Sequence, residues 1–460
     1  IYTKFDFIKA VWKNRPEMPK SPVIEFGEEH SGENTKSKLS RLREQIASNN
    51  ANTMLITALD EIAWLFNIRG ADIDYNPVNI SFALVTPNKA TLFIAEEKIS
   101  DKVRNYLNKF DVNTEAYENI YQALQTLSGD TIIAIDPNKC NYALKIAIPE
   151  NVTIKEISSP IANMKCIKNE TELSGVGRAM VKDGVALVKF WMWLEEKIEN
   201  KETVTELDVI ENLHKFRAEQ EGFITESFNT IAGYGEHGAI VHYAADKDSN
   251  ATLKAESFLL LDSGGQYYDG TTDITRTVAL GKVTQEMKFD YTMVLKGHLA
   301  LGYQLFPYGT RGAQLDAIAR QFLWNSEMQY GHGTGHGVGH CLNVHEGPQS
   351  IRMNENPTIL EKGMILSNEP GIYRAGKHGI RIENLVVVSD YPNNENEFGK
   401  FMRFKTLTLF PYDNKSIEIG LLSPDELLQI NTYHQIVYKT LSPHLNTKEA
   451  AWLKSKTAQL

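Results

Sequence analysis

The 460-residue sequence has little cysteine, only Cys140, Cys166 and Cys341. An odd number this small argues against a disulfide framework and favours a reducing compartment, so we expect a cytoplasmic protein. No run of about 18 apolar residues is present, so no membrane-spanning helix is expected. Positive charge is also in deficit, because the formal net charge is -10. That balance argues against nucleic acid or an acidic membrane as the main partner.

The chain also starts without methionine, at Ile1. We therefore expect that a leading segment, or a whole leading domain, is missing. Residues 1–30 include the proline-rich stretch RPEMPKSPV, which is typical of extended chain. We predict that residues 1–30 are a linker or the end of that missing domain.

Three further parts are expected along the chain. Residues 31–160 alternate helical and strand-like stretches, including two strands in SFALVTPNKATLFIA, and predict a smaller α/β domain. Residues 161–422 predict an α+β domain in which helices pack on a mostly antiparallel sheet. Its strands are expected in ESFLLLDSGG, DITRTVAL, GMILSNEPGIY and GIRIENLVVVSD. Residues 423–460 predict a helical extension.

Two helices of the larger domain show their starting points in the sequence. Asn169 is followed three residues later by Glu172, which is typical of a capped helix start. Thr205 is the expected cap of the next helix.

Four of the 12 histidines lie in residues 330–348, YGHGTGHGVGHCLNVHEGP. They are His332, His336, His340 and His345. The alternating glycines would each cost a helix about 1 kcal/mol relative to alanine. A helical H-E-x-x-H zinc site also does not fit, because Gly333 stands where that motif has Glu. The pattern predicts an irregular strand that lines a site and presents its histidines one by one.

Carboxylates end or interrupt the apolar strands of the same domain. Asp262 ends a buried run, Asp273 starts the next strand, and Glu369 precedes Pro370 at a strand end. Glu383 lies inside the otherwise apolar GIRIENLVVV. A buried carboxylate is costly unless it is paired or bound to a metal ion.

Salt bridges to Arg276 and Arg381 are one explanation of these carboxylates. Four of them in one domain, together with the histidine tract, favour a shared metal site. An oxygen-rich ligand set suits Mn, Mg or Co better than structural zinc. Two divalent ions about 3.5–4 Å apart serve hydrolysis.

The sequence as a whole resembles aminopeptidase P, the Xaa-Pro aminopeptidases of the pita-bread metallopeptidase fold. The stretches that carry the resemblance are LLLDSGGQYYDGTTDITRT, GHGTGHGVGHCLNVHEGP, LSNEPGIY and GIRIENLVVV. It extends through ESFNTIAGYGEHGAIVHYA to TALDEIAWLFNIRGADIDYNPV and covers nearly the whole chain. The closest likeness is to the longer, three-domain cytosolic form without its leading domain. The resemblance implies a creatinase N-terminal type α/β domain followed by a pita-bread catalytic domain.

The resemblance also implies a set of metal ligands. They are Asp262, Asp273, His336, Glu369 and Glu383. Asp262 would bind one ion, His336 and Glu369 the other, and Asp273 and Glu383 both. Glu369 would also act as general base. The implied cofactors are two divalent ions, with Mn expected and Zn or Co as alternatives.

A second set of residues is implied to lie around the substrate. They are His242, His332, His345, Tyr373 and Arg381. The three histidines would hold the scissile carbonyl and steady its developing negative charge. Arg381 lies two residues from Glu383 and is expected to orient a bridging carboxylate. His340 departs from the family and is predicted to be structural, with Cys341 as buried packing.

The implied activity is hydrolysis of the bond between any N-terminal residue and a penultimate proline, by a hydroxide held between the two ions. Prolidase, which accepts only Xaa-Pro dipeptides, is the first alternative. A non-catalytic pita-bread binding module is the second, although such modules lose metal ligands. The implied partners are peptide substrates and a second copy of the chain in a homodimer, to which the apolar residues of 423–460 would contribute.

Overall fold

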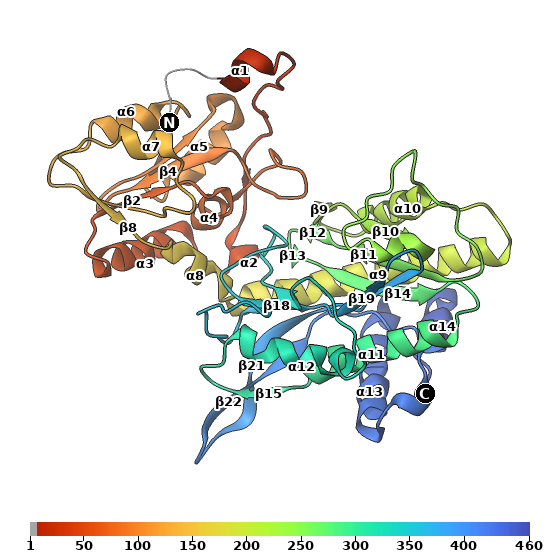
Figure 1. Cartoon of the computed structure of the whole chain (residues 1–460). Helices are drawn as coiled ribbons and strands as arrows, with labels where there is room; N and C mark the ends of the chain where they lie inside the picture. Colours follow the sequence, from red (N-terminus) through yellow and green to blue (C-terminus); the bar gives the residue numbers. More distant parts are fainter. Residues whose placement is uncertain (1–6) are drawn as a thin grey trace. The chain divides into compact units, whose positions relative to one another are not determined.

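The computed structural model describes residues 7–460 (Figure 1). Residues 1–6, part of the expected linker at 1–30, lie outside the described residues. The chain forms two compact units. One comprises the chain through Glu25, Thr35–Ile73 and Val78–Ser158, and the other comprises Phe26–Asn34, Asp74–Pro77 and Ser159–Leu460.

The first unit is built on a mixed sheet of six strands in the order β6-β5-β4-β2-β7-β8. Its strands are β2 (Thr53–Ile56), β4 (Ser81–Val85), β5 (Ala90–Ile94), β6 (Val112–Glu115), β7 (Ile132–Ile135) and β8 (Thr153–Glu156). A separate pair is formed by β1 (Ile24–Glu25) and β3 (Ile68–Arg69). The hairpin expected in SFALVTPNKATLFIA is confirmed, because Val85 pairs with Ala90 across the turn.

The first unit also contains helices, which apart from α1 lie between its strands along the chain. They are α1 (Phe7–Val11), α3 (Thr35–Ser48), α4 (Leu59–Leu65), α5 (Asp101–Asn108), α6 (Asn119–Gln125) and α7 (Tyr142–Ala147). Ile120 and Leu124 of α6 and Leu144 of α7 are fully buried against Ile133 and Ile135 of β7. Burial of this apolar face holds α6 and α7 on the sheet.

The second unit contains small sheets in which every strand pair is antiparallel. The first two are β10-β11-β14 and β13-β12-β9, the third is β15-β22-β21-β18, and β16-β17 and β19-β20 are pairs. The strands before residue 280 are β9 (Phe223–Glu226), β10 (Ile231–Tyr234), β11 (Phe258–Ser263), β12 (Gly265–Tyr267), β13 (Gly270–Thr271) and β14 (Ile274–Ala279). The later strands are β15 (Leu305–Pro307), β16 (Gly335–His336), β17 (Ser350–Ile351), β18 (Ile365–Asn368), β19 (Gly371–Arg374), β20 (His378–Arg381), β21 (Asn384–Asn396) and β22 (Gly399–Thr406).

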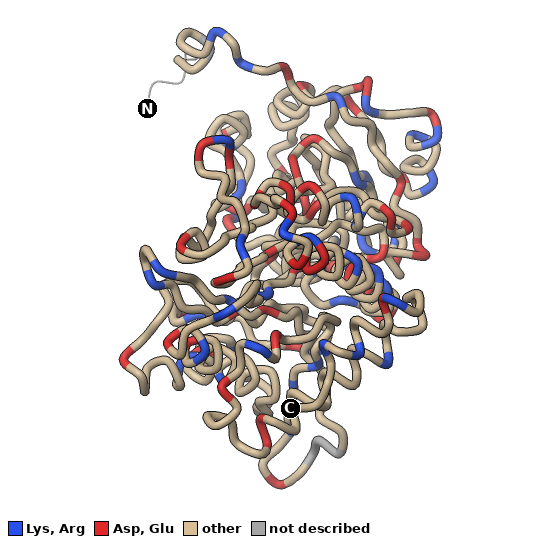
Figure 2. Tube along the Cα trace, turned by 90° about the vertical axis from the view of Figure 1, so that its right-hand side faces the viewer, with Lys and Arg blue, Asp and Glu red and all other residues tan. Residues whose placement is uncertain are grey.

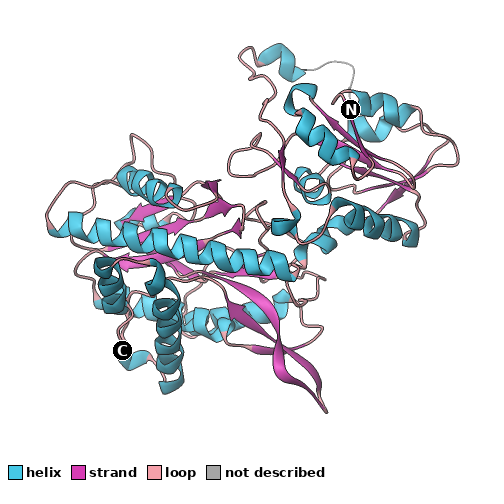
Figure 3. Ribbon diagram, turned by 180° about the vertical axis from the view of Figure 1, so that it is seen from behind, coloured by secondary structure: helices cyan, strands magenta, loops and turns pink. Residues whose placement is uncertain are grey.

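Helices surround these sheets, and the longest, α9, runs the length of the unit (Figure 3). They are α2 (Glu28–Ser31), α8 (Pro160–Cys166), α9 (Glu170–Glu199), α10 (Glu206–Ala218), α11 (Gln285–Gly302), α12 (Gly312–Trp324), α13 (Pro424–Leu441) and α14 (Thr447–Lys456). Both expected helix starts are confirmed. Asn169 and Glu172 form a capping box at α9, and Thr205 caps α10 by accepting a hydrogen bond from the backbone of Asp208.

Two stretches expected to form strands are each divided in the structure. GMILSNEPGIY forms β18 and β19, and Glu369 lies between them, at the strand end where it was expected. GIRIENLVVVSD forms β20 and β21, so the prediction of Glu383 inside a strand is wrong. At Glu383 the backbone N–H donates to the carbonyl of Thr275 in β14 instead of continuing β20. Each break turns a carboxylate side chain out of the alternating pattern.

Charged residues of both signs are distributed over the whole chain (Figure 2). Among the described residues, no helix is both long and apolar enough to cross a membrane. Cys140, Cys166 and Cys341 form no disulfide bond, and the last two are buried.

The C-terminal helices pack on the main core of the second unit. Ile430, Val437 and Leu441 of α13 and Leu453 of α14 are fully buried there. His434 of α13 is also buried, and its Nε2 accepts a hydrogen bond from the Tyr412 backbone N–H at 3.1 Å. Because this nitrogen must be unprotonated to accept, the contact requires neutral imidazole.

Acid should therefore weaken the docking of α13. Burial lowers the pKa of His434 to about 4, so between its unfolded pKa near 6.5 and about 4 only the unfolded chain binds this proton. Stability rises with pH in that window and is lost as pH falls through it, by up to about 3 kcal/mol. We expect the acid-induced loss of unfolding free energy to be smaller in His434→Gln than in the wild type. Parallel losses in denaturant titrations from pH 7 to 4 would contradict this.

Candidate metal centre

One cavity of the second unit collects the residues singled out in the sequence. Its volume is about 510 Å³. The predicted residues that line it are His242, Asp262, Asp273, His332, His336, His345, Glu369, Arg381 and Glu383. Tyr373, also predicted to contact substrate, does not line the cavity. Its hydroxyl forms hydrogen bonds with His332 and Arg381, which do line it.

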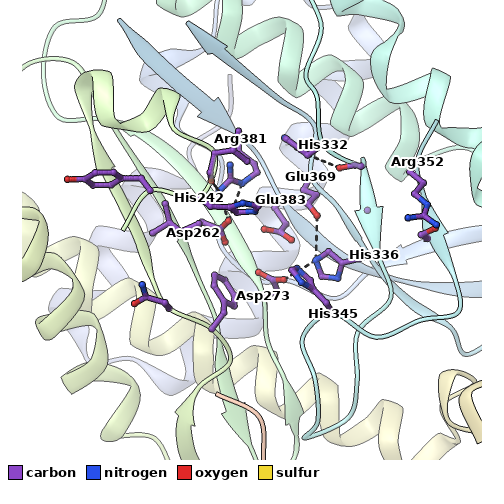
Figure 4. Close-up of a pocket in the computed structure, with 18 of the residues that line it drawn as sticks. His242, Asp262, Asp273, His332, His336, His345, Arg352, Glu369, Arg381 and Glu383 are labelled. Carbon is purple, nitrogen blue, oxygen red and sulfur yellow. Dashed lines mark hydrogen bonds and ion pairs between the residues drawn. The ribbon is translucent and has the colours of Figure 1, made fainter. Parts of the chain in front are cut away.

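Five of these side chains face a common space in the cavity (Figure 4). Asp262 lies near the end of β11, Asp273 just before β14, and His336 on β16. Glu369 and Glu383 lie at the two strand breaks described above. Five segments separated by up to 121 positions, from 262 to 383, thus meet at one point.

The distances within this group are those of potential metal ligands. His336 Nε2 lies 3.4 Å from both Asp273 Oδ2 and Glu369 Oε1. Asp273, His336 and Glu383 each offer a ligand atom within 4.8 Å of the others. Asp262 of β11 pairs with Thr275 of β14, the strand that begins directly after Asp273.

Crowding of the carboxylates changes their acidity. The pKa of Asp273 is raised well above its usual value by burial and by the charges of Asp262 and Glu369. Burial and the neighbouring carboxylates likewise raise the pKa of Glu383 well above its usual value. Burial raises the pKa of Glu369, although His336 and Arg381 oppose that shift. The group is therefore short of positive charge.

A pair of divalent ions fits this group. Asp262 Oδ1 and Glu383 Oε1 are buried and have no hydrogen-bond partner among the described residues. Buried oxygens without a partner are costly, and a cation at this point would satisfy them. Four carboxylates and one imidazole are a hard, oxygen-rich donor set of the kind that binds divalent cations.

Small hydroxyl side chains fix the orientation of two carboxylates, and the sequence reading missed them. Thr275 Oγ1 donates to Glu383 Oε2 at 2.8 Å. Ser367 Oγ donates to Glu369 Oε1 at 3.0 Å and accepts from the His336 backbone N–H. Both hydroxyl residues lie within the motifs TDITRT and LSNEPG, beside the predicted ligands. This placement is the signal in the sequence that could have identified them.

Arg381 contacts a different carboxylate from the one expected. Its Nη2 and Nε lie 2.5 and 3.1 Å from Asp262 Oδ2, whereas the expected target was a bridging carboxylate. The expected orienting role toward a bridging carboxylate stays a prediction, because the guanidinium contacts Asp262 near the end of β11. It reaches Glu383 only through Thr275 Oγ1, at 3.2 Å. Arg276 binds backbone carbonyls and side-chain oxygens of Asn384 and Tyr433, so it is no carboxylate partner.

His332 is the end of a hydrogen-bond chain. Its Nδ1 lies 2.7 Å from the Gly333 carbonyl, so Nδ1 carries the proton and Nε2 accepts from Tyr373 Oη at 2.7 Å. Arg381 Nη1 in turn donates to Tyr373 Oη at 2.7 Å. Burial lowers the pKa of His332 to about 4, which agrees with a neutral ring.

The other histidines divide between the cavity and the packing. His345 lies against the His336 ring, with centroids 4.2 Å apart, and burial lowers its pKa to about 4. His340 lies outside the cavity lining, where its Nε2 meets the His30 carbonyl at 3.1 Å, and Cys341 is fully buried. Of the glycine-rich tract, only Gly335–His336 is strand. The rest is bends and loop, so the expected irregular strand is much shorter than predicted.

The pKa shifts predict how metal binding depends on pH. Carboxyl groups with raised folded pKa values stabilise the metal-free fold at low pH, and this stability is lost as pH rises through those values. Metal ions replace the protons, so their binding strengthens as pH rises. We expect Mn²⁺ to increase the melting temperature, relative to chelator-treated protein, more at about pH 8 than at about pH 5.5. A gain that is equal or larger at the lower pH would contradict this.

Comparison with known proteins places the chain among metallopeptidases. Residues 14–172 match the creatinase/prolidase N-terminal domain, 175–390 match metallopeptidase family M24, and 400–460 match the C-terminal region of M24 peptidases. A Xaa-Pro aminopeptidase P of Coprinopsis cinerea is 40% identical over 100% of this chain and 77% of its own length. Xaa-Pro aminopeptidase 1 of Dictyostelium discoideum is 41% identical over 97% of this chain and 72% of its own.

Solved structures agree with these sequences. The X-prolyl aminopeptidase of Caenorhabditis elegans, a cytosolic enzyme with a di-nuclear active site, is 34% identical. It superposes with a TM-score of 0.94 over 100% of this chain and 76% of its own. The Xaa-Pro dipeptidase of Bacillus anthracis shares the fold at 23% identity, with a TM-score of 0.66 over 83% of this chain and 99% of its own. The expected fold, a creatinase N-terminal type domain followed by a pita-bread domain, is confirmed, and the chain belongs to metallopeptidase family M24, among the Xaa-Pro aminopeptidases P.

Proposed function

We propose that the chain is a metal-dependent aminopeptidase that hydrolyses the bond between an N-terminal residue and a penultimate proline. The observation that carries the proposal is the meeting of four carboxylates and one imidazole in a single cavity. Relatives that match almost the whole chain at 40% and 41% identity are Xaa-Pro aminopeptidases, which supports the substrate class.

Two divalent ions are the proposed cofactors, and manganese is the proposed metal because oxygen ligands outnumber nitrogen in the set. Asp262 would bind one ion, His336 and Glu369 the other, and Asp273 and Glu383 both. When bound, the ions polarise a carbonyl group and make water more acidic. Asp262 remains tied to Arg381 in this arrangement, which leaves its second oxygen for a ligand role.

Glu369 is the proposed general base. Burial raises its pKa, which moves the carboxylate toward the range in which it can take a proton near neutral pH and return it. The Ser367 hydroxyl holds one oxygen at 3.0 Å and leaves the other to face the cavity. The proton taken from water would pass through this carboxylate to the proline nitrogen, which leaves as the amine.

Imidazole side chains are proposed to hold the peptide. His242 and His345 line the cavity and can donate an N–H to the carbonyl oxygen as negative charge develops there. His332 uses its N–H on Gly333 and accepts from Tyr373, so we propose that the His332 ring itself faces the peptide and that Tyr373 holds this ring in place. Arg381 holds the Tyr373 hydroxyl from the other side.

Selectivity for proline requires a wall that accepts a ring without an N–H. Phe228, Ile231 and Tyr243 line the cavity and supply apolar surface for it. Proline cannot donate a backbone hydrogen bond, so peptidases that grip an extended N–H do not recognise it. A shaped apolar wall does not need that bond.

A tripeptide assay separates this proposal from the alternatives. The aminopeptidase should release the N-terminal residue from Xaa-Pro-Xaa and from longer peptides. A prolidase would cleave only the Xaa-Pro dipeptide, and a non-catalytic binding module would cleave neither. Failure to cleave any tripeptide after loading with Mn²⁺ would reject the proposal.

We also propose a cytoplasmic homodimer with the domain division 31–160, 161–422 and 423–460. The cytosolic C. elegans enzyme supports the location. Leu428 and Ile436 of α13 are 66% and 51% exposed, which supports a contribution of this helix to the dimer. Sedimentation equilibrium showing a monomer at micromolar concentration would reject the dimer.

Replacing a shared ligand should remove metal and activity together. In Glu383→Ala, the site loses the oxygen that has no protein partner, so we expect less than one bound ion per chain and loss of peptide cleavage. Metal analysis after dialysis measures the first, and the exposed Glu355→Ala is the matched control. Two fully occupied ions in Glu383→Ala would remove this residue from the ligand set.

Replacing a peptide-contacting histidine should separate activity from metal content. We expect His345→Ala to lower kcat by about 10²-fold, the scale of losing one transition-state donor, with both ions retained. The exposed His214→Ala is the control, because His214 lies outside the cavity lining. Loss of metal in His345→Ala would instead make His345 a ligand.

A further inference from the structure

A fully buried carboxylate stands outside the metal centre, at the first residue of α10. Glu206 is 0% exposed. Glu206 does not line the cavity. Among the described residues, no lysine or arginine forms an ion pair with it. Burying a charge in this way is costly unless several donors replace its water.

Four donors do so, and one of them, His237 Nδ1, lies within reach of both oxygens, at 2.8 Å from Oε1 and 3.1 Å from Oε2. Oε1 accepts from the Tyr234 backbone N–H at 2.8 Å and lies 2.8 Å from His237 Nδ1. Oε2 accepts from Tyr243 Oη at 2.8 Å and from the Ala251 backbone N–H at 2.9 Å. Both oxygens of the carboxylate are therefore fully used.

All four donors belong to one segment, residues 234–251, and they lie on both sides of His242. Tyr234 and His237 precede it, and Tyr243 and Ala251 follow it. The ring of His237 also stacks on Tyr243, with centroids 4.5 Å apart. The Glu206 side chain thus joins the two ends of a loop that carries the cavity residue His242.

The rest of the loop offers less support for His242. The Val241 carbonyl accepts a long hydrogen bond of 3.4 Å from Arg381 Nη2. Gly238 packs against Gly379 of β20, where a Cβ on Gly379 would meet the Gly238 oxygen at 1.7 Å. The loop therefore rests on the hairpin that carries Arg381, and its two flanks are joined by Glu206 and by the stacking of His237 on Tyr243.

We infer that Glu206 is a positioning residue for the proposed peptidase, acting through His242 and Tyr243. This inference rests on the proposed function, because it assigns Glu206 the task of holding the peptide-contacting imidazole at the cavity wall. Its charge is essential, since a carboxylate accepts on both oxygens. A glutamine in either orientation would point its NH₂ group at two donors.

Glu206→Gln should displace the loop without touching the metal ligands. We expect kcat/KM for an Xaa-Pro tripeptide to fall by about 10- to 100-fold, the range for a reacting group misplaced by about 1 Å. Bound Mn²⁺ per chain should stay at the wild-type value. Glu211→Gln is the matched control, because Glu211 lies on the same helix with its side chain 64% exposed.

A double-mutant cycle with His242→Ala distinguishes positioning from general damage. If Glu206 acts through His242, Glu206→Gln should change kcat/KM less than twofold in the His242→Ala background. An equal loss in both backgrounds overturns the inference, and so does wild-type kcat/KM in Glu206→Gln. Should Glu206→Gln fail to fold, His237→Phe keeps the stacked ring, removes one donor, and should show a smaller loss with the same dependence on His242.

Hydrogen–deuterium exchange tests the inference without catalysis. Peptides covering residues 234–251 should exchange faster in Glu206→Gln, or in His237→Phe, and the rest of the second unit should be unchanged. Unchanged exchange in that segment overturns the inference. A wild-type chain that cleaves no Xaa-Pro tripeptide rejects the proposed function, and the exchange result alone then decides the role of Glu206.

Discussion

Mutual repulsion among four carboxylates, three of them buried and Glu369 partly exposed, is the constraint on which the second unit depends. Asp262, Asp273, Glu369 and Glu383 share one cavity, and Arg381 is the one buried arginine that pairs with them in the described part of the chain. One guanidinium cannot offset four negative charges in a medium of low dielectric. The deficit appears as raised carboxyl pKa values, and it makes the fold receptive to cations. The same repulsion that opposes folding thus supplies affinity for metal.

Loops and short hairpins surround the four carboxylates. Charged groups that are buried on the surrounding helices hold these loops and hairpins in place. These groups are Glu206 on α10, Asp290 on α11, Arg320 on α12, and Lys165 and Lys168 in and after α8. Arg320 shows the pattern, since its Nη2 donates to the His332 carbonyl at 2.8 Å. Removing one partner of such a buried group leaves the other without a partner in the protein interior, which lowers the free energy of unfolding by about 3–5 kcal/mol. The loops are therefore as rigidly placed as the strands.

Sequence patterns predicted the helices well because their signals are local. The cap at Asn169 and the hairpin at residues 81–94 needed only neighbouring residues. The strand end at Glu369, before Pro370, was expected, whereas the break at Glu383 escaped prediction, because apolar residues continue on both sides of it and its backbone N–H bonds to Thr275 of the distant β14. Glu206 looked like an ordinary first-turn acid of a helix, since its donors lie 28 to 45 positions away. The five-residue ligand set came from motif resemblance and stays a prediction.

The hydrogen-bond chain from Asp262 through Arg381 and Tyr373 to His332 joins the metal side of the cavity to the peptide side. A peptide that displaces the His332 ring breaks the hydrogen bond between His332 and Tyr373. This changes the hydrogen bond that Tyr373 accepts from Arg381, and hence the contact of Arg381 with Asp262. Two ligands coupled through shared groups alter each other's affinity by the same factor. Metal and peptide should accordingly bind with reciprocal cooperativity. The concentration of free metal at which the chain is half loaded is then a property of the substrate present, as well as of the protein.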